Sequence, residues 1–273
     1  MEGKAVNETR HQESKVRIPP TGPFRTCVHS VCLSLTLICL ASSPSARAVA
    51  PSQATFQQGY DAYAAGAYEQ AAVVFGELAA CEPSVGVFHN LGNAEWKRGR
   101  IGDAVLAWER AQWLSPFSAN TRANLRFARQ KAQLPVPALA WYEICSTWLP
   151  VGTWAVLAAG SFWLALAMVL LPGILHWRKA DWHQGFAAGS LAIFLLTIPA
   201  LVGVHTRSEL GVVLSKDTPL RLTPTHEGQI LGRLPAGEIA RIERARGQYF
   251  YIRAGNENAA WVDGTQFGRI SVR

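Results

Sequence analysis

The chain has 273 residues, of which only 16% are charged, and it carries 26 lysine and arginine residues against 19 aspartate and glutamate residues. Soluble domains carry roughly 25% charged residues, and the deficit here lies in two uncharged stretches, 144–177 and 182–206, which exclude a simple cytosolic globule. Ten tryptophans exclude a disordered chain, and the positive charge is spread along the chain rather than gathered in one patch, which excludes electrostatic binding of DNA or RNA.

The first segment, residues 1–50, has the pattern of an export signal. An apolar run at 28–41 follows Arg25, and the Ser- and Ala-rich stretch after it ends in A-R-A at 46–48. A basic flank, a short apolar core and an A-x-A site are typical of secretory signals. We therefore expect residues 1–50 to be a signal peptide or signal anchor, and the domain after them to be exported.

Residues 51–134 contain an internal repeat with a period of 33 residues. Five residue pairs match at this period: Gly59 and Gly92, Gly66 and Gly99, Ala71 and Ala104, Phe75 and Trp108, Pro83 and Pro116. These spacings resemble the tetratricopeptide (TPR) repeat, an αα-hairpin of about 34 residues, although Glu95 stands where the pattern has tyrosine. Small residues let the two helices approach, and each proline ends a second helix. A third, partial copy starts near Asn120, so we expect two and a half α-helical repeats.

The first helix of each TPR pair lines the concave face, where such repeats bind peptides. Five side chains are expected there: Tyr60, Tyr63, His89, Asn93 and Lys97. Asn93 could hydrogen-bond an extended peptide backbone, and Lys97 could pair with a carboxylate. The alternative is that Asn93 and the aromatic residues only satisfy the requirements of the fold.

Residues 135–207 contain two apolar runs of about 20 residues, at 152–171 and 185–204. About 20 residues of α-helix cross the hydrocarbon core of a membrane. Tryptophans gather at the ends of both runs, as is typical of a membrane interface. Neither run has an ionisable residue at its centre, which argues against transport. We therefore predict two transmembrane helices rather than a buried helical hairpin.

The loop between the two predicted spans, residues 176–183, carries Arg178 and Lys179. Basic loops lie preferentially on the cytoplasmic side. If the first domain is exported, this loop faces the cytoplasm, and residues 51–134 and 208–273 share the opposite side. The expected location is the bacterial inner membrane, with both soluble domains in the periplasm.

Residues 208–273 show short strand patterns separated by glycine and proline. The strand candidates are 212–214, 219–222, 238–244, 248–253 and 260–262. Short strands at such regular spacing predict a small antiparallel β-barrel.

Three motifs in this segment resemble those of bacterial SH3-like domains. They are Leu234-Pro235-Ala236-Gly237-Glu238, Tyr249 with Ile252-Arg253, and Trp261-Val262. The resemblance implies a small all-β SH3-like barrel that binds peptides or cell-wall fragments, with Tyr249, Tyr251 and Trp261 lining a groove. The alternative is that Trp261 is a core residue of a structural barrel.

The order of signal, TPR pair, paired spans and SH3-like domain resembles the TPR-containing E-type component of the Bacteroides aerotolerance (Bat) family. Three segments carry the resemblance: 90–93 (NLGN), 108–111 (WERA) and 124–129 (NLRFAR). The resemblance implies a membrane-anchored scaffold that works with von Willebrand A-type Bat proteins and a MoxR-type ATPase.

No catalytic constellation accompanies these modules. The sequence has no GxxxxGK[ST], HExxH, GxSxG, SxxK or CxxC motif. Cys81 and Cys145 are isolated, and they form neither a disulfide framework nor a metal site. We therefore expect no enzyme, no cofactor and no metal. Two functions stay open: a scaffold that binds a protein partner through the TPR groove, or an envelope tether that holds peptidoglycan or its stem peptides through the SH3-like domain.

Overall fold

The computed structural model describes residues 53–174, 182–255 and 258–272. The expected signal segment, 1–50, and most of the expected cytoplasmic loop, 176–183, lie outside the described residues. Within these ranges the chain forms eight α-helices followed by a seven-stranded antiparallel sheet. The expected combination of helices, two long apolar helices and a C-terminal sheet is therefore present.

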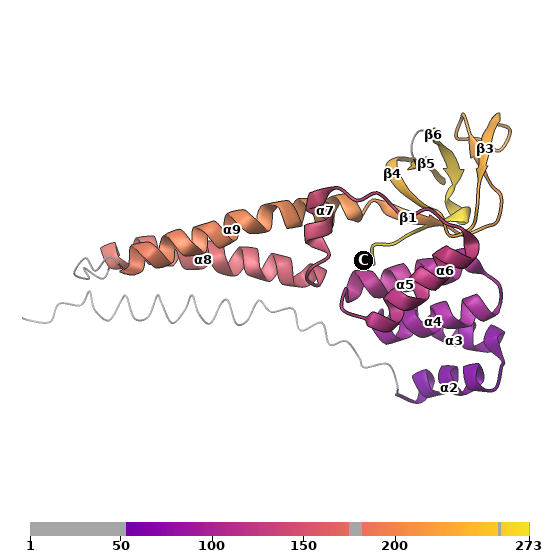
Figure 1. Ribbon diagram of the computed structural model, residues 1–273, viewed down its shortest axis with the longest axis horizontal. Coiled ribbons are helices and arrows are strands. Elements are labelled where there is room, and N and C mark those ends of the chain that lie inside the picture. The colour runs from indigo at the N-terminus through magenta and orange to yellow at the C-terminus, as the bar shows by residue number, and fades with distance from the viewer. Residues whose placement is uncertain (1–52, 175–181, 256–257, 273) are drawn as a thin grey trace, which may run out of the picture. The chain divides into compact units, whose positions relative to one another are not determined.

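Five helices form an N-terminal helical module that follows the repeat pattern. They are α2 (Gln53–Ala64), α3 (Tyr68–Cys81), α4 (Val85–Lys97), α5 (Ile101–Leu114) and α6 (Ala119–Ala132). Each helix packs against the next one in the chain (Figure 1). Gly66 and Gly99 follow α2 and α4 with φ angles of 79° and 76°, a left-handed conformation that favours glycine at the end of a helix. The matched glycines of the repeat thus end the first helix of each pair.

Each helical pair is closed by an aromatic ring that lies on a glycine. A Cβ atom added at Gly92 would lie 2.5 Å from the ring of Trp108, and one added at Gly59 would lie 2.9 Å from the ring of Phe75. Any larger side chain would push the ring away. This contact explains why a glycine and an aromatic residue recur together in the repeat.

The middle of the chain forms a short helix and two long ones. They are α7 (Trp141–Ser146), α8 (Val151–Ile174) and α9 (Trp182–Arg207). At about 1.5 Å per residue, α8 is about 36 Å long, which exceeds the roughly 30 Å hydrocarbon core of a bilayer. The two long helices lie side by side (Figure 1), and most of their apolar side chains face away from the protein. Both are therefore long and apolar enough to cross a membrane, and neither is a buried core helix.

The C-terminal part of the chain forms one sheet. Its strands are β1 (Leu210–Val213), β2 (Thr218–Arg221), β3 (Ile230–Leu234), β4 (Ile239–Arg246), β5 (Tyr249–Ala254), β6 (Asn258–Asp263) and β7 (Phe267–Arg269). Their order in the sheet is β3-β2-β6-β5-β4-β1-β7. The five predicted strands are present, and β3 and β7 are additional.

The prediction of a closed barrel is wrong, because the sheet is open. In the described part of the chain, the edge strands β3 and β7 pair only with β2 and β1. A barrel removes its edges by closing on itself, but here the β7 edge contacts α5 instead. The guanidinium of Arg110 donates hydrogen bonds of 3.0 and 3.1 Å to the carbonyl oxygen of Arg269. Covering an edge strand in this way makes closure unnecessary.

The helical module and the sheet share one hydrophobic core. Its buried members include Val105 and Leu125 from the helices and Leu210, Val212 and Ile270 from the sheet segment. A second cluster lies within the sheet itself, and a third lies between α2, α3 and α4. The two modules predicted as separate domains are therefore packed together.

The two modules approach each other closely at Gly102, which yields a test of the shared core. A Cβ atom added there would collide with the backbone of Leu214. We expect Gly102→Ala to lower the free energy of unfolding by about 1–3 kcal/mol, because overpacking forces α5 away from β1. Thermal unfolding of the detergent-solubilised chain, followed by circular dichroism, measures the change.

Gly76 provides the matched control, because it lies inside α3 and an added Cβ would meet nothing within 4 Å. In a helix, alanine is favoured over glycine by about 1 kcal/mol, so Gly76→Ala should raise stability. The two identical substitutions are thus expected to act with opposite signs. Equal stabilisation by both would show that α5 does not pack against β1 in solution.

Candidate functional site

The five residues predicted for the concave face, called the inner face below, lie on α2 and α4, and two of them bond to α6. His89 Nδ1 lies 3.0 Å from Thr121 Oγ1. Asn93 Oδ1 accepts hydrogen bonds from Trp108 Nε1 at 3.3 Å and from Asn124 Nδ2 at 2.8 Å. Burial lowers the pKa of His89, so that its ring is neutral at pH 7. Both side chains therefore join neighbouring helices.

The other three predicted residues of this face are placed differently. Tyr63 is half-buried and packs edge-on against Tyr68 of α3, with ring centroids 5.3 Å apart. Tyr60 is 52% exposed, and Lys97 is also exposed. Tyr60 and Lys97 are thus the predicted residues whose side chains are most open to a ligand.

Phe127 was not predicted, although it lies on α6, the helix that bonds to His89 and Asn93 of α4. It lies 34 residues after Asn93 and matches it when NLRF at 124–127 is aligned with NLGN at 90–93, whereas Tyr60 lies 33 residues before Asn93. Its ring is 47% exposed and contacts Trp96 edge-on, with centroids 5.5 Å apart. The three first helices therefore carry an aromatic residue, an amide and an aromatic residue at one repeat position. Aligning NLRF at 124–127 with NLGN at 90–93, at an offset of 34, would have found Phe127.

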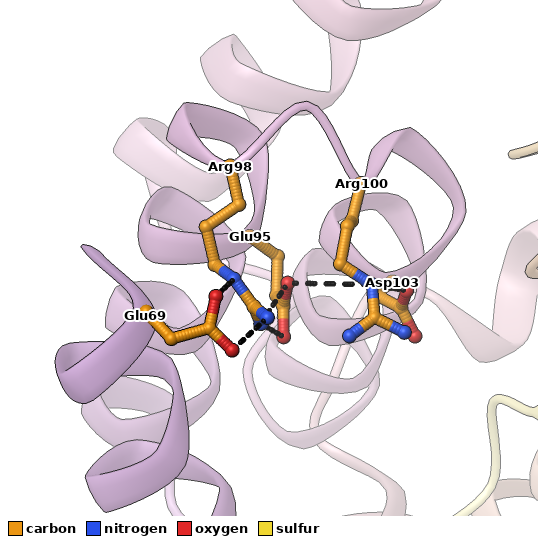
Figure 2. Close-up of polar contacts among 5 residues, drawn as sticks. All are labelled: Glu69, Glu95, Arg98, Arg100 and Asp103. Carbon is orange, nitrogen blue, oxygen red and sulfur yellow. Dashed lines mark hydrogen bonds and ion pairs between the residues drawn. The ribbon is translucent and has the colours of Figure 1, made fainter.

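A network of five charged side chains links α3, α4 and α5 (Figure 2). Arg98 bridges two carboxylates, at 2.6 Å from Glu69 and 2.9 Å from Glu95, and Arg100 pairs with Asp103 at 3.0 Å. Burial raises the pKa of Glu95, although the positive charge of Arg98 acts in the opposite direction. Glu95 thus replaces the tyrosine of the repeat pattern with a buried ion pair. Because every member has a partner, the network joins helices rather than offering a binding site.

The predicted groove of the sheet is only partly exposed. Tyr249 is a core residue, 6% exposed, and its ring contacts His226 with centroids 5.9 Å apart. Tyr251 and Trp261 are half-buried, and their rings form a pair with centroids 5.1 Å apart. The exposed part of the predicted groove is therefore the Tyr251–Trp261 pair.

A buried carboxylate joins the long helices to the sheet. The side chain of Glu143 is 1% exposed, pairs with Arg241 of β4 at 2.6 Å and accepts a hydrogen bond of 2.9 Å from the Ala140 N–H. Arg241 also donates to the carbonyl oxygen of Thr206, near the end of α9, at 2.8 Å. Burial alone would raise the pKa of Glu143, but the hydrogen bonds from Ala140, Arg241 and Thr206 and the charge of Arg241 outweigh it and lower the pKa. In the sequence, Glu143 stands out only as the last charged residue before the first apolar run, 152–171.

The described residues contain no group of three or more histidine, cysteine, aspartate or glutamate side chains that could hold a metal ion. Comparison of the chain with protein-family models, curated proteins and solved structures finds no match.

Proposed function

We propose that the protein is a membrane-anchored scaffold whose helical module binds a protein partner on its inner face. The observation that carries the proposal is the pair of exposed aromatic residues, Tyr60 and Phe127, at one repeat position of the first helices. Aromatic residues are enriched at protein interfaces, where they supply much of the binding energy. Lys97 lies on α4 between them in the chain and supplies a positive charge.

The shared core supports a single soluble unit on one side of the membrane. The helical module precedes α8 and the sheet follows α9, and residues from both contribute to one cluster. If α8 and α9 both cross the bilayer, the two modules lie on the same side. With an export signal at 1–50, that side is the periplasm of a bacterial inner membrane. By the resemblance to Bat proteins, the partner class is a von Willebrand A-type protein that acts with a MoxR-type ATPase.

A photo-crosslinking experiment tests the proposal. A photoreactive amino acid is placed at Tyr60 or at Phe127 of the full chain in living cells, and crosslinked proteins are identified by mass spectrometry. Both positions are expected to capture the same partner, because they hold equivalent positions in the first helices of the repeat. Val73 of α3 is as exposed as Tyr60 and provides the control position. Capture of the same proteins from Val73, or of none from Tyr60 and Phe127, would contradict the proposal.

The alternative function, a tether to the cell wall, is supported by the half-buried pair of Tyr251 and Trp261. Because the sheet shares its core with α5, binding to purified sacculi should be measured with the full chain rather than with residues 208–273 alone. Retention that Tyr251→Ala abolishes and Tyr60→Ala leaves unchanged would favour the tether. The opposite pattern would favour binding at the inner face.

A further inference from the structure

A cavity of about 520 Å³ lies where the helical module, the long helices and the sheet meet. Its walls come from α5, α6, the linker after α6 and three apolar residues of the sheet segment, Leu210, Ile239 and Ile270. Thr147 and Arg207 line it near the long helices, since Thr147 lies just before α8 and Arg207 is the last residue of α9. The cavity therefore lies at the base of both predicted spans.

The charges around this cavity are unbalanced. Four arginines line it, Arg122, Arg126, Arg129 and Arg207, against the carboxylate of Glu109. Arg129 forms an ion pair with Glu109, whereas the exposed Arg122 and Arg126, one helical turn apart on α6, have no side-chain partner among the described residues. Burial raises the pKa of Glu109, against the opposing charges of Arg129 and Arg207. The single carboxylate of Glu109 does not neutralise the four arginines, so the electrostatic potential of the cavity is positive.

Two further polar side chains of the cavity wall, Arg207 and Gln112, are held in place by contacts within the chain. The guanidinium of Arg207 lies over the ring of Trp113, 5.2 Å from its centroid, which fixes its orientation. Gln112 also lines the cavity and donates to the carbonyl oxygen of Pro116 at 3.1 Å.

We propose that this cavity binds a phosphate ester, with Arg122 and Arg126 contacting the phosphate oxygens. Arginine matches phosphate because its planar guanidinium presents two parallel N–H donors to two oxygens. The apolar wall of Leu210, Ile239 and Ile270 suits the carbon part of the ester. One source of such a group is the headgroup of an anionic phospholipid, and this source rests on the proposed membrane insertion of α8 and α9. The other source is a soluble phosphate ester.

The test measures binding to the full chain in detergent by microscale thermophoresis. The probes are short-chain phosphatidylglycerol, short-chain phosphatidylcholine and glycerol phosphate. The test variant combines Arg122→Gln with Arg126→Gln. The control combines Arg244→Gln with Arg246→Gln, two exposed arginines of β4 that also lack a side-chain partner among the described residues. Circular dichroism of each variant verifies that it is folded.

Phosphatidylglycerol is expected to bind more tightly than phosphatidylcholine, and the test variant should bind it roughly tenfold or more weakly while the control is unchanged. Equally tight binding of glycerol phosphate would identify a soluble ester as the source. The proposal is overturned if no probe binds, or if both variants lose the same affinity. Flotation of the wild-type chain with neutral phosphatidylcholine vesicles measures membrane insertion separately, and the crosslinking experiment above tests the partner surface, so failure of one proposal is distinguishable from failure of the other.

Discussion

Replacement of Trp108 by alanine is expected to lower the free energy of unfolding by about 3–5 kcal/mol, the range for truncating a buried tryptophan. The side chain is 2% exposed and fills the space against Gly92. Its Nε1 also donates to the carbonyl oxygen of His89 at 3.2 Å and to Asn93. The substitution therefore leaves a cavity and removes a donor from the contact between helices. Chemical denaturation of the solubilised chain, followed by its helical circular dichroism, measures the loss.

Two further variants separate packing from hydrogen bonding at this site. Trp108→Phe keeps most of the buried ring and removes the donor, so its cost should be clearly smaller than that of Trp108→Ala. Phe117→Ala removes an exposed ring from the loop between α5 and α6 and should change stability little. If Trp108→Ala costs no more than Phe117→Ala, Trp108 is not the core of the helical pair.

The second large effect is expected at Glu143. Glu143→Ala removes the carboxylate that pairs with Arg241 and accepts from the Ala140 N–H. Because a buried charge left without its partner is strongly unfavourable, and because Arg241 is still partly exposed, we expect a loss of about 2–3 kcal/mol. In the double variant with Arg241→Ala the cost should be less than the sum of the two single costs. Additive costs would show that the two side chains do not interact.

The same carboxylate predicts a pH dependence. The pKa of Glu143 is lowered in the folded chain, so the ionised form stabilises the fold at pH values above the ordinary glutamate range. This contribution is lost as the pH falls through the lowered pKa. The difference in stability between wild type and Glu143→Gln should therefore shrink on acidification below about pH 4. A difference that stays constant would mean that Glu143 is not ionised in the folded chain.

The local features of the fold were predictable because each depends on a few residues near in sequence. Gly66 and Gly99 indicate helix ends, because the left-handed backbone conformation found there favours glycine. The two long helices were predictable from uninterrupted apolar runs. β3 was missed because its residues are mostly exposed, with only Leu234 buried, and β7 because its sequence, Phe267-Gly268-Arg269, holds a single apolar side chain.

Contacts between distant segments were not predictable from periodicity. The open sheet depends on α5 covering β7, and the segments that meet there lie far apart in the chain. Glu143 pairs with Arg241 of β4, which lies 98 residues later in the chain, so no local sequence pattern predicts the pair. On the inner face, the repeat period identifies the position of Asn93. Which side chain donates a hydrogen bond to Asn93, however, depends on how α6 packs against α4.

The shared core also constrains the order in which the segments of the chain can fold during synthesis. α5 is synthesised before the two long helices, and the residues that cover it, near Ile270, are synthesised after them. Its apolar surface stays uncovered until both long helices are placed and β7 has been made. Contacts of such sequence separation form slowly, and uncovered apolar surface promotes aggregation in the meantime. A chain truncated after α9 should therefore be held by chaperones or degraded, and not accumulate as a free helical module.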